Sequence, residues 1–271
     1  MARTLCIANH KGGTGKTTTA VNLAAGLARK DYRVLLVDFD PQGNASMALG
    51  VDIEALEYSV TDLLTGRMLD YQYLLWKKDE NLKILPANTS LRTLEPELVA
   101  EVDGRIRLKA RLQLAQEEFD YIIIDTPPTA GILTQGPLIA SHQVIAPIDV
   151  GFFSLEGIRQ LLADITKIRA HYNPALEIRG VLLTKYDSRT VLSKQVEKTL
   201  RNNFGKQVFE TVIRVNVDLI RAQIQRENIF EFDPECPGAQ DYQNLIHELV
   251  GNVVALPKRR AVSAKVKAKS R

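Results

Sequence analysis

Short apolar runs alternate with longer amphipathic segments along most of this chain. The runs at residues 34–38 and 121–125 are apolar up to a final aspartate, which is typical of strands buried on both faces of a parallel sheet. The pattern predicts strands at residues 4–9, 34–38, 82–86, 121–125, 143–148, 178–184 and 207–213. It predicts helices at residues 16–30, 60–76 (broken), 90–116 (broken), 131–141, 154–171, 191–203, 216–226 and 239–255.

This alternation predicts an α/β fold with a single doubly wound, mostly parallel sheet flanked by helices. The length of 271 residues and the hydrophobic content of 45% suit one large domain with an ample core. We expect that domain to span residues 1–256 and a basic, unstructured tail to span residues 257–271.

The segment between the first predicted strand and the first predicted helix is rich in glycine. It reads Lys-Gly-Gly-Thr-Gly-Lys-Thr-Thr over residues 11–18. A strand, a glycine-rich loop and a helix in this order form a phosphate-binding site, because glycines let backbone N–H groups turn inward and the helix N-terminus adds partial positive charge. The ordinary pattern has glycine at position 10, where this chain has His10 followed by Lys11 and a doubled glycine. The loop is therefore a rarer variant of the phosphate loop.

The chemistry of the loop predicts how it binds a nucleotide. The Lys16 ammonium can reach the β- and γ-phosphates, and the Thr17 hydroxyl can hold the Mg²⁺ that bridges them. We predict that the ATP-binding residues of this segment are Lys11, Gly12, Gly13, Thr14, Gly15, Lys16, Thr17 and Thr18.

Three aspartates follow the buried strands. Because ligands bind at the carboxyl ends of parallel strands, we expect Asp38, Asp40 and Asp125 to face the nucleotide. Asp125 suits the magnesium shell together with Thr17 and Asp38. Asp40 lies two residues beyond its strand, where it could orient a water molecule against the γ-phosphate.

Three motifs together resemble the ParA/MinD family of deviant Walker-box ATPases, and in particular its ParA (Soj) and McdA-like branch. These motifs are KGGTGKTT, VLLVDFDPQGN and YIIIDTPP, and the resemblance continues through APIDVGFFSLEGI and LLTKYDSRT over most of residues 1–250. It implies a P-loop NTPase with a deviant Walker A motif that uses ATP and Mg²⁺, and a weak ATPase activity stimulated by a partner. It also implies a homodimer with ATP sandwiched between the subunits. In that dimer Lys11 reaches the phosphates of the other subunit and Asp40 positions the attacking water, so that Lys11, Lys16 and Asp40 are the catalytic set.

The same resemblance implies a biological cycle. In its ATP state the dimer binds DNA without sequence preference, and hydrolysis stimulated by an adaptor releases it, so that a cargo is segregated or spaced. The cargo is a plasmid or chromosome with a ParB-like adaptor, or a protein cargo such as a carboxysome with an McdB-like adaptor. We expect a cytoplasmic, nucleoid-associated protein without an operator-binding domain.

Positive charge is concentrated in two parts of the chain. Residues 257–271 contain seven basic residues and no acidic one, and residues 185–226 contain nine basic and four acidic residues. Such stretches favour polyanions. We predict that the DNA-binding residues are Arg189, Arg221, Lys258, Arg259 and Arg260. The segment at residues 214–221 departs from the family pattern RNVRLSEAPSHG, which leaves the contacts open, and Lys185 and Asp187 are candidates for the base or ribose side of the nucleotide pocket.

The main alternative is a MinD-like membrane-associated positioning ATPase. Such a protein would end in an amphipathic helix with bulky apolar residues, whereas the tail offers only Val262 and Val266. No apolar run approaches the roughly 20 residues needed to span a bilayer, so we expect no stable membrane insertion. Cys6 and Cys236 are far apart in the sequence and suggest no disulfide framework, zinc site or iron–sulfur cluster.

Overall fold

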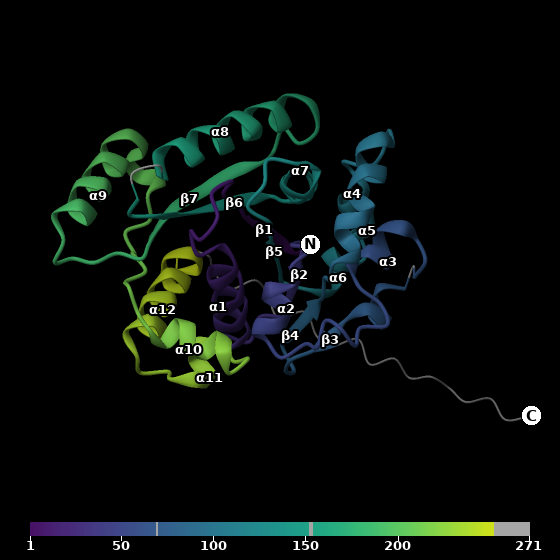
Figure 1. Ribbon diagram of the computed structural model, residues 1–271, viewed down its shortest axis with the longest axis horizontal. Helices are drawn as coiled ribbons and strands as arrows, with labels where there is room; N and C mark the ends of the chain where they lie inside the picture. Colours follow the sequence, from purple (N-terminus) through teal and green to yellow (C-terminus); the bar gives the residue numbers. More distant parts are fainter. Residues whose placement is uncertain (69, 152–153, 252–271) are drawn as a thin grey trace, which may run out of the picture.

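The computed structural model describes residues 1–68, 70–151 and 154–251. Within these ranges a seven-stranded sheet with the order β3-β4-β2-β5-β1-β6-β7 forms the centre of the molecule (Figure 1). Its strands are β1 (Arg3–Ile7), β2 (Val34–Asp38), β3 (Trp76–Lys77), β4 (Leu82–Leu85), β5 (Tyr121–Asp125), β6 (Gln143–Asp149) and β7 (Glu177–Thr184). All neighbours pair in parallel except β3 with β4. The predicted doubly wound, mostly parallel sheet is confirmed.

Helices cover both faces of this sheet (Figure 1). They are α1 (Lys16–Ala28), α2 (Asn44–Ala48), α3 (Val60–Thr65), α4 (Ser90–Ala100), α5 (Arg107–Arg111), α6 (Ala115–Glu118), α7 (Ile132–Ala140), α8 (Ser154–His171), α9 (Val191–Phe204), α10 (Asp218–Ile224), α11 (Ile229–Phe232) and α12 (Pro237–Val250). Two short 3-10 turns are η1 (Tyr71–Leu74) and η2 (Gly205–Gln207). None of these helices combines the length and the hydropathy that crossing a bilayer requires.

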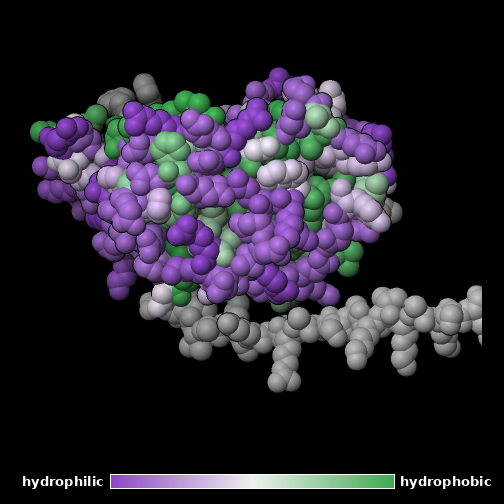
Figure 2. All heavy atoms as spheres, turned by 90° about the horizontal axis from the view of Figure 1, so that it is seen from below, coloured by the Kyte–Doolittle hydropathy of each residue, from purple (hydrophilic) through white to green (hydrophobic). Residues whose placement is uncertain are grey.

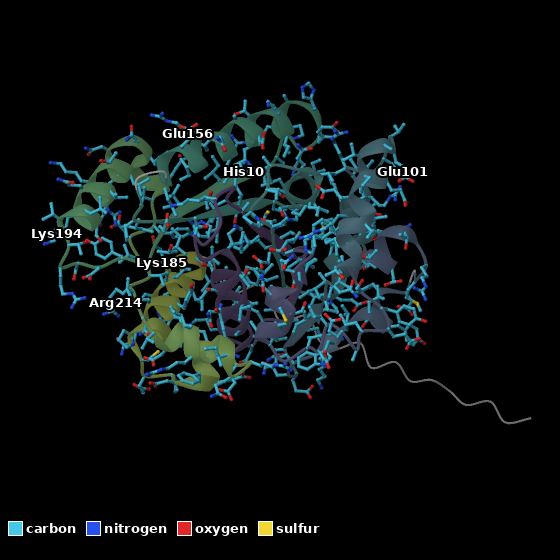
Figure 3. The ribbon with its side chains drawn as sticks, viewed as in Figure 1. His10, Glu101, Glu156, Lys185, Lys194 and Arg214 are labelled. Atoms are coloured by element: carbon cyan, nitrogen blue, oxygen red, sulfur yellow. The ribbon has the colours of Figure 1, made fainter. Side chains whose placement is uncertain are left out.

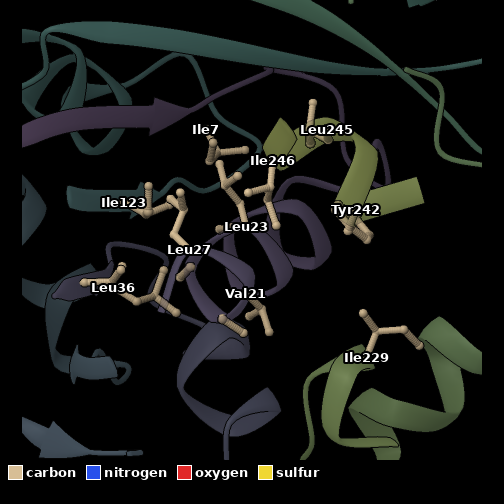
Figure 4. Packing of buried hydrophobic residues seen from close by; sticks show 14 of the residues in the cluster. Ile7, Val21, Leu23, Leu27, Leu36, Ile123, Ile229, Tyr242, Leu245 and Ile246 are labelled. Atoms are coloured by element: carbon tan, nitrogen blue, oxygen red, sulfur yellow. The ribbon is translucent and has the colours of Figure 1, made fainter. Parts of the chain in front are cut away.

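The core follows from the alternation of side chains along the strands. Leu36 of β2 packs toward α1 and α12, whereas Leu35 and Val37 pack on the other face, in the cluster that includes residues of α3, α4 and α7. Figure 4 shows the first of these clusters, where Leu23 and Leu27 of α1 meet side chains of the sheet and of α12. Because both faces are covered, the central strands β2 and β5 are buried along their whole length and apolar up to the aspartate that ends each of them.

The predicted strand at residues 207–213 is wrong. This segment runs beside β7 and makes only isolated bridges, Val181 with Val208 and Tyr186 with Arg214. The amides of Glu210 and Thr211 donate instead to the Glu248 carboxylate of α12, at 2.7 and 2.9 Å. A side chain from a distant helix therefore interrupts the ladder.

Other boundaries differ more modestly. The broken helix predicted over residues 60–76 consists of α3, capped by Gly66 in the left-handed conformation with φ 76°, and the 3-10 turn η1, whereas Trp76 belongs to the antiparallel edge strand β3. The short helices α2 and α11 were not predicted from the sequence. The helix predicted to reach residue 255 is described to Val250, and the tail at residues 257–271 lies outside the described residues. Figure 2 shows a face that is mostly hydrophilic, with hydrophobic residues in separate patches.

Candidate nucleotide site

The glycine-rich loop connects the end of β1 to the start of α1. Gly13 and Gly15 have φ of 72° and 84°, a left-handed backbone that glycine adopts without strain. Gly15 precedes the first residue of α1, so the loop leads directly into the helix N-terminus. The Thr184 hydroxyl at the end of β7 donates to the Thr14 carbonyl at 2.9 Å and anchors the loop to the sheet. This arrangement directs the positive end of the helix toward the loop.

Lys16 is the first residue of α1, and it is only 6% exposed. Its Nζ donates to the Lys11 carbonyl at 3.1 Å. Burial lowers the pKa of the Lys16 ammonium, while the nearby carboxylates of Asp125 and Asp40 act in the opposite direction. The residue is therefore a cation held in a site where it lacks water, which strengthens its attraction to phosphate.

Asp38 and Asp125 lie opposite each other on the adjacent strands β2 and β5. Both side chains are fully buried. Asp38 accepts hydrogen bonds from the amide and the hydroxyl of Ser46 at 2.8 and 2.7 Å. Burial nevertheless raises the pKa of Asp38 to about 6. Two carboxylates this close in a dry site favour a cation between or beside them.

Asp125 also contacts the first turn of α1. The Thr17 hydroxyl donates to Asp125 Oδ2 at 2.7 Å, whereas Asp125 Oδ1 is buried without a hydrogen-bond partner. Burial and the charge of Asp38 raise the pKa of Asp125 well above its usual range. A hydroxyl beside a carboxylate with one unsatisfied oxygen is the donor set that Mg²⁺ prefers, so these residues fit the metal.

Asp40 lies just beyond β2 and is 6% exposed. Its amide donates to Asp38 Oδ1 at 3.1 Å, and its own Oδ1 accepts from the Gln42 amide at 2.9 Å. These bonds fix the carboxylate at the wall of the neighbouring pocket. The geometry suits a residue that orients a small polar molecule.

A pocket of about 640 Å³ opens beside the loop. Its lining comes from the loop, α1, α2, α10 and adjoining turns: Gly13, Gly15, Lys16, Thr17, Thr18, Asp40, Asn44, Met47, Ala48, Pro128, Lys185, Ile220, Gln223, Ile224 and Arg226. Such a pocket has room for a nucleotide, with its phosphates at the loop.

The α10 side of this pocket was not predicted from the sequence. Ile220, Gln223 and Ile224 face the pocket, and Gln223 Nε2 donates to the Thr18 hydroxyl at 2.9 Å. Their spacing of three and four residues places them on one face of a helix, which is the signal that could have identified them. Helix α10 therefore forms one wall of the pocket and is hydrogen-bonded to α1 there.

Lys11 lies outside the lining of this pocket. Its Nζ contacts both carboxylate oxygens of Asp149, the last residue of β6, at 2.8 and 3.0 Å. The structure thus separates the two lysines of the loop, with Lys16 at the pocket and Lys11 at the end of β6.

Lys185 lines the pocket, with φ of 51°. Asp187 does not line it and instead pairs with Arg189 at 2.9 and 2.8 Å, and these hydrogen bonds lower the pKa of Asp187 to about 2. The Arg189 side chain is 88% exposed, and that of Arg221 is 61% exposed and paired with Asp218.

Basic side chains also gather around this end of the molecule. Lys185, Lys194 of α9 and Arg214 come from the segment between β7 and α10 (Figure 3). The Arg214 guanidinium is held by Asp241 at 2.7 Å. Lys258, Arg259 and Arg260, the remaining candidate DNA contacts, lie outside the described residues.

Comparisons with known proteins identify relatives of this chain. A protein-family model described as an AAA domain matches residues 2–178. The sporulation initiation inhibitor protein Soj of Bacillus subtilis is 41% identical over 252 residues, which cover 93% of this chain and 100% of Soj. A solved structure described as cobyrinic acid a,c-diamide synthase from Mycobacterium smegmatis, with bound ADP and magnesium, is 34% identical with a TM-score of 0.80, and the match covers 91% of this chain and 93% of that one. Apo McdA from Cyanothece, 23% identical, shares the fold with a TM-score of 0.84 over 93% of this chain and 100% of that one.

Proposed function

The chain belongs to the ParA/MinD family of deviant Walker-box ATPases, and from this premise we propose that it is a partition or positioning ATPase. It binds and hydrolyses ATP with Mg²⁺, forms a dimer around the nucleotide, and binds DNA without sequence preference in that state. Hydrolysis stimulated by an adaptor then releases it from DNA. The protein is cytoplasmic and associates with the nucleoid.

The observation that carries the proposal is the separation of Lys11 from Lys16. Lys16 lines the pocket that its own loop forms, whereas Lys11 lies at the end of β6 beyond the lining of that pocket. We infer that a lysine in the phosphate loop whose ammonium lies outside the nucleotide pocket of its own subunit serves the nucleotide of a second subunit. This supports a dimer in which each subunit completes the site of the other.

Residues of the pocket and of the neighbouring strand ends have separate roles in hydrolysis. A water molecule attacks the γ-phosphorus while the bond from that phosphorus to the ADP oxygen breaks, giving ADP and phosphate. Asp40 orients this water, and Lys16 neutralises the negative charge of the β- and γ-phosphates. Thr17, Asp38 and Asp125 would hold Mg²⁺, which would supply further positive charge to the phosphates.

Dimerisation explains why DNA binding would depend on ATP. Arg189 and Arg221 have side chains that are 88% and 61% exposed. We call these two arginines the basic surface. One subunit offers few phosphate contacts, and a dimer doubles them, with each neutralised phosphate adding affinity through counterion release. Lys258, Arg259 and Arg260 of the tail add further charge. Lys185, which lines the pocket, serves the base or ribose side of the nucleotide, whereas Asp187 holds Arg189 and is not assigned to the nucleotide.

The proposed cargo follows from the relatives. Proteins named chromosome partitioning protein ParA, from Myxococcus xanthus and Caulobacter vibrioides, are 38% and 39% identical to this chain. We propose a chromosome or plasmid moved through a ParB-like adaptor. A protein cargo with an McdB-like adaptor, such as a carboxysome, is the second possibility, since McdA shares the fold.

Mass measurement by light scattering tests the proposal. The chain of 30.2 kDa is expected to double in mass with ATP and Mg²⁺ when hydrolysis is blocked by Asp40→Ala, and to stay monomeric with ADP or without nucleotide. Adding Lys11→Ala to that variant should abolish the dimer while ATP binding persists. A dimer that forms equally well without Lys11 would contradict the proposed role of this lysine.

A further inference from the structure

The ion pair between Lys11 and Asp149 joins two segments that are distant in the sequence. Lys11 Nζ lies 2.8 Å from Asp149 Oδ1 and 3.0 Å from Oδ2, so both carboxylate oxygens contact the same ammonium. The two side chains are 30% and 20% exposed, which limits screening by water. This pair is the most direct observation of where Lys11 lies in a single subunit.

The backbone around Lys11 is fixed by the same strand. The fully buried Asn9 donates from Nδ2 to the Pro147 carbonyl of β6 at 2.7 Å, and its Oδ1 accepts from the Lys11 amide at 3.0 Å. Asn9 therefore ties the start of the loop to β6. Lys11 and Asp149 are each two residues beyond that tie, which places their side chains opposite each other.

Helix α8 closes the third side of this arrangement. A Cβ atom added to Gly157 of α8 would lie 2.9 Å from Asn9 Oδ1 and 3.5 Å from Lys11 Cβ. Only a residue without a side chain allows the helix to approach this closely. The Lys11 backbone is therefore fixed by Asn9 between β6 and the close approach of Gly157 on α8.

We propose that Asp149 is a positioning residue that holds the Lys11 ammonium in the single subunit and so sets how readily the ATP-bound dimer forms. The proposal rests on the proposed role of Lys11 in the dimer. The Asp149 carboxylate and the phosphates of the second subunit compete for one ammonium, so Lys11 must leave Asp149 before it can serve that nucleotide.

The first test measures the contact itself, without nucleotide and therefore independently of dimerisation. Trace acetylation with acetic anhydride, read by mass spectrometry, reports how accessible the Lys11 amine is. Asp149→Asn should raise the labelling rate of Lys11 about threefold, while the exposed Lys30 serves as the internal reference. Asp149→Glu keeps the carboxylate and should restore slow labelling. Equal labelling of Lys11 in the wild type and in Asp149→Asn would overturn the proposal.

The second test measures the consequence. With ATP and Mg²⁺, Asp149→Asn should dimerise at about fivefold lower protein concentration than the wild type, in keeping with the loss of one partly exposed ion pair. Asp120→Asn is the matched control, because Asp120 pairs with Arg33 at 2.9 Å just before the amino ends of β2 and β5. This variant should dimerise at the same midpoint protein concentration as the wild type. If the wild type dimerises and Asp149→Asn needs the same or a higher protein concentration to become half dimeric, the proposal is overturned.

The two proposals fail in distinguishable ways. A wild type that does not dimerise with ATP contradicts the proposed function and leaves the labelling experiment to decide on Asp149. Asp149→Asn combined with Lys11→Ala should behave like Lys11→Ala alone, since Asp149 acts through Lys11. A double variant that dimerises more readily than Lys11→Ala would show that Asp149 acts elsewhere, and that also overturns the proposal.

Discussion

Thr17, in the first turn of α1, donates a hydrogen bond of 2.7 Å to Asp125 at the end of β5. The second oxygen of this carboxylate is buried without a hydrogen-bond partner, and Asp38 lies opposite on the adjacent strand. An unsatisfied buried carboxylate oxygen destabilises the fold until a cation or another donor reaches it. We expect a Mg²⁺ ion at this carboxylate to satisfy the remaining oxygen and so to stabilise the fold.

The first prediction concerns Asp125. Asp125→Asn keeps an oxygen for the Thr17 hydroxyl and removes the charge that would hold Mg²⁺. With ATP and Mg²⁺ at about 100 times the dissociation constant, the wild type should gain roughly 5–10 °C in Tm, and the variant should gain little. Differential scanning fluorimetry with EDTA as the control measures this, and a gain as large in the variant would exclude Asp125 from the metal site.

The second prediction concerns Lys16. Lys16→Ala should weaken ATP binding at least about 100-fold, because a largely desolvated ammonium at the phosphates is lost. Titration with a fluorescent ATP analogue measures the affinity. Lys30→Ala, at an exposed residue just beyond the end of α1, is the matched control and should bind as the wild type does. Retained affinity in Lys16→Ala would place the phosphates elsewhere.

The third prediction separates binding from hydrolysis. Asp40→Ala should reduce ATP turnover about 100-fold or more, while ATP affinity changes by less than about threefold, because Asp40 orients water rather than holding phosphate. The exposed Asp52 provides the control Asp52→Ala. Phosphate release assayed beside nucleotide titration gives both quantities, and full turnover in Asp40→Ala would assign the water to another residue.

The fourth prediction concerns the basic surface. Arg189→Ala and Arg221→Ala should each weaken DNA binding for any sequence and reduce the slope of log affinity against log salt by about 1 per lost contact. Arg33→Ala is the control, since Arg33 lies beside the amino ends of β2 and β5 and pairs with Asp120. An unchanged slope in both variants would remove these arginines from the DNA-binding surface.

Much of this architecture was predictable because it depends on local patterns. The apolar runs that end in Asp38 and Asp125 specified two buried parallel strands, and the register of β2 with β5 confirms that their ends meet. The glycine-rich loop before α1 likewise determined where Lys16 and Thr17 would lie. Strand ends and loops of this kind carry their chemistry in contiguous residues.

The features that escaped prediction depend on contacts between distant residues. The segment at residues 207–213 has the composition of a strand, but Glu248 of α12 takes two of its amides. The pairing of Lys11 with Asp149 joins residues 138 positions apart. The pocket wall formed by α10 depends on the bond from Gln223 to Thr18, across 205 positions. No local sequence pattern predicts such contacts between distant residues.

Binding to a long DNA duplex of arbitrary sequence, with ATP, with ADP and without nucleotide, is the measurement that tests the central claim most directly. Asp40→Ala, which should keep ATP intact during the measurement, is the protein to use at near-physiological salt. The account predicts binding with ATP and at least about tenfold weaker binding in the other two states, because only the dimer presents both basic surfaces. Equal binding in all three states, or binding to anionic vesicles in place of DNA, would contradict it.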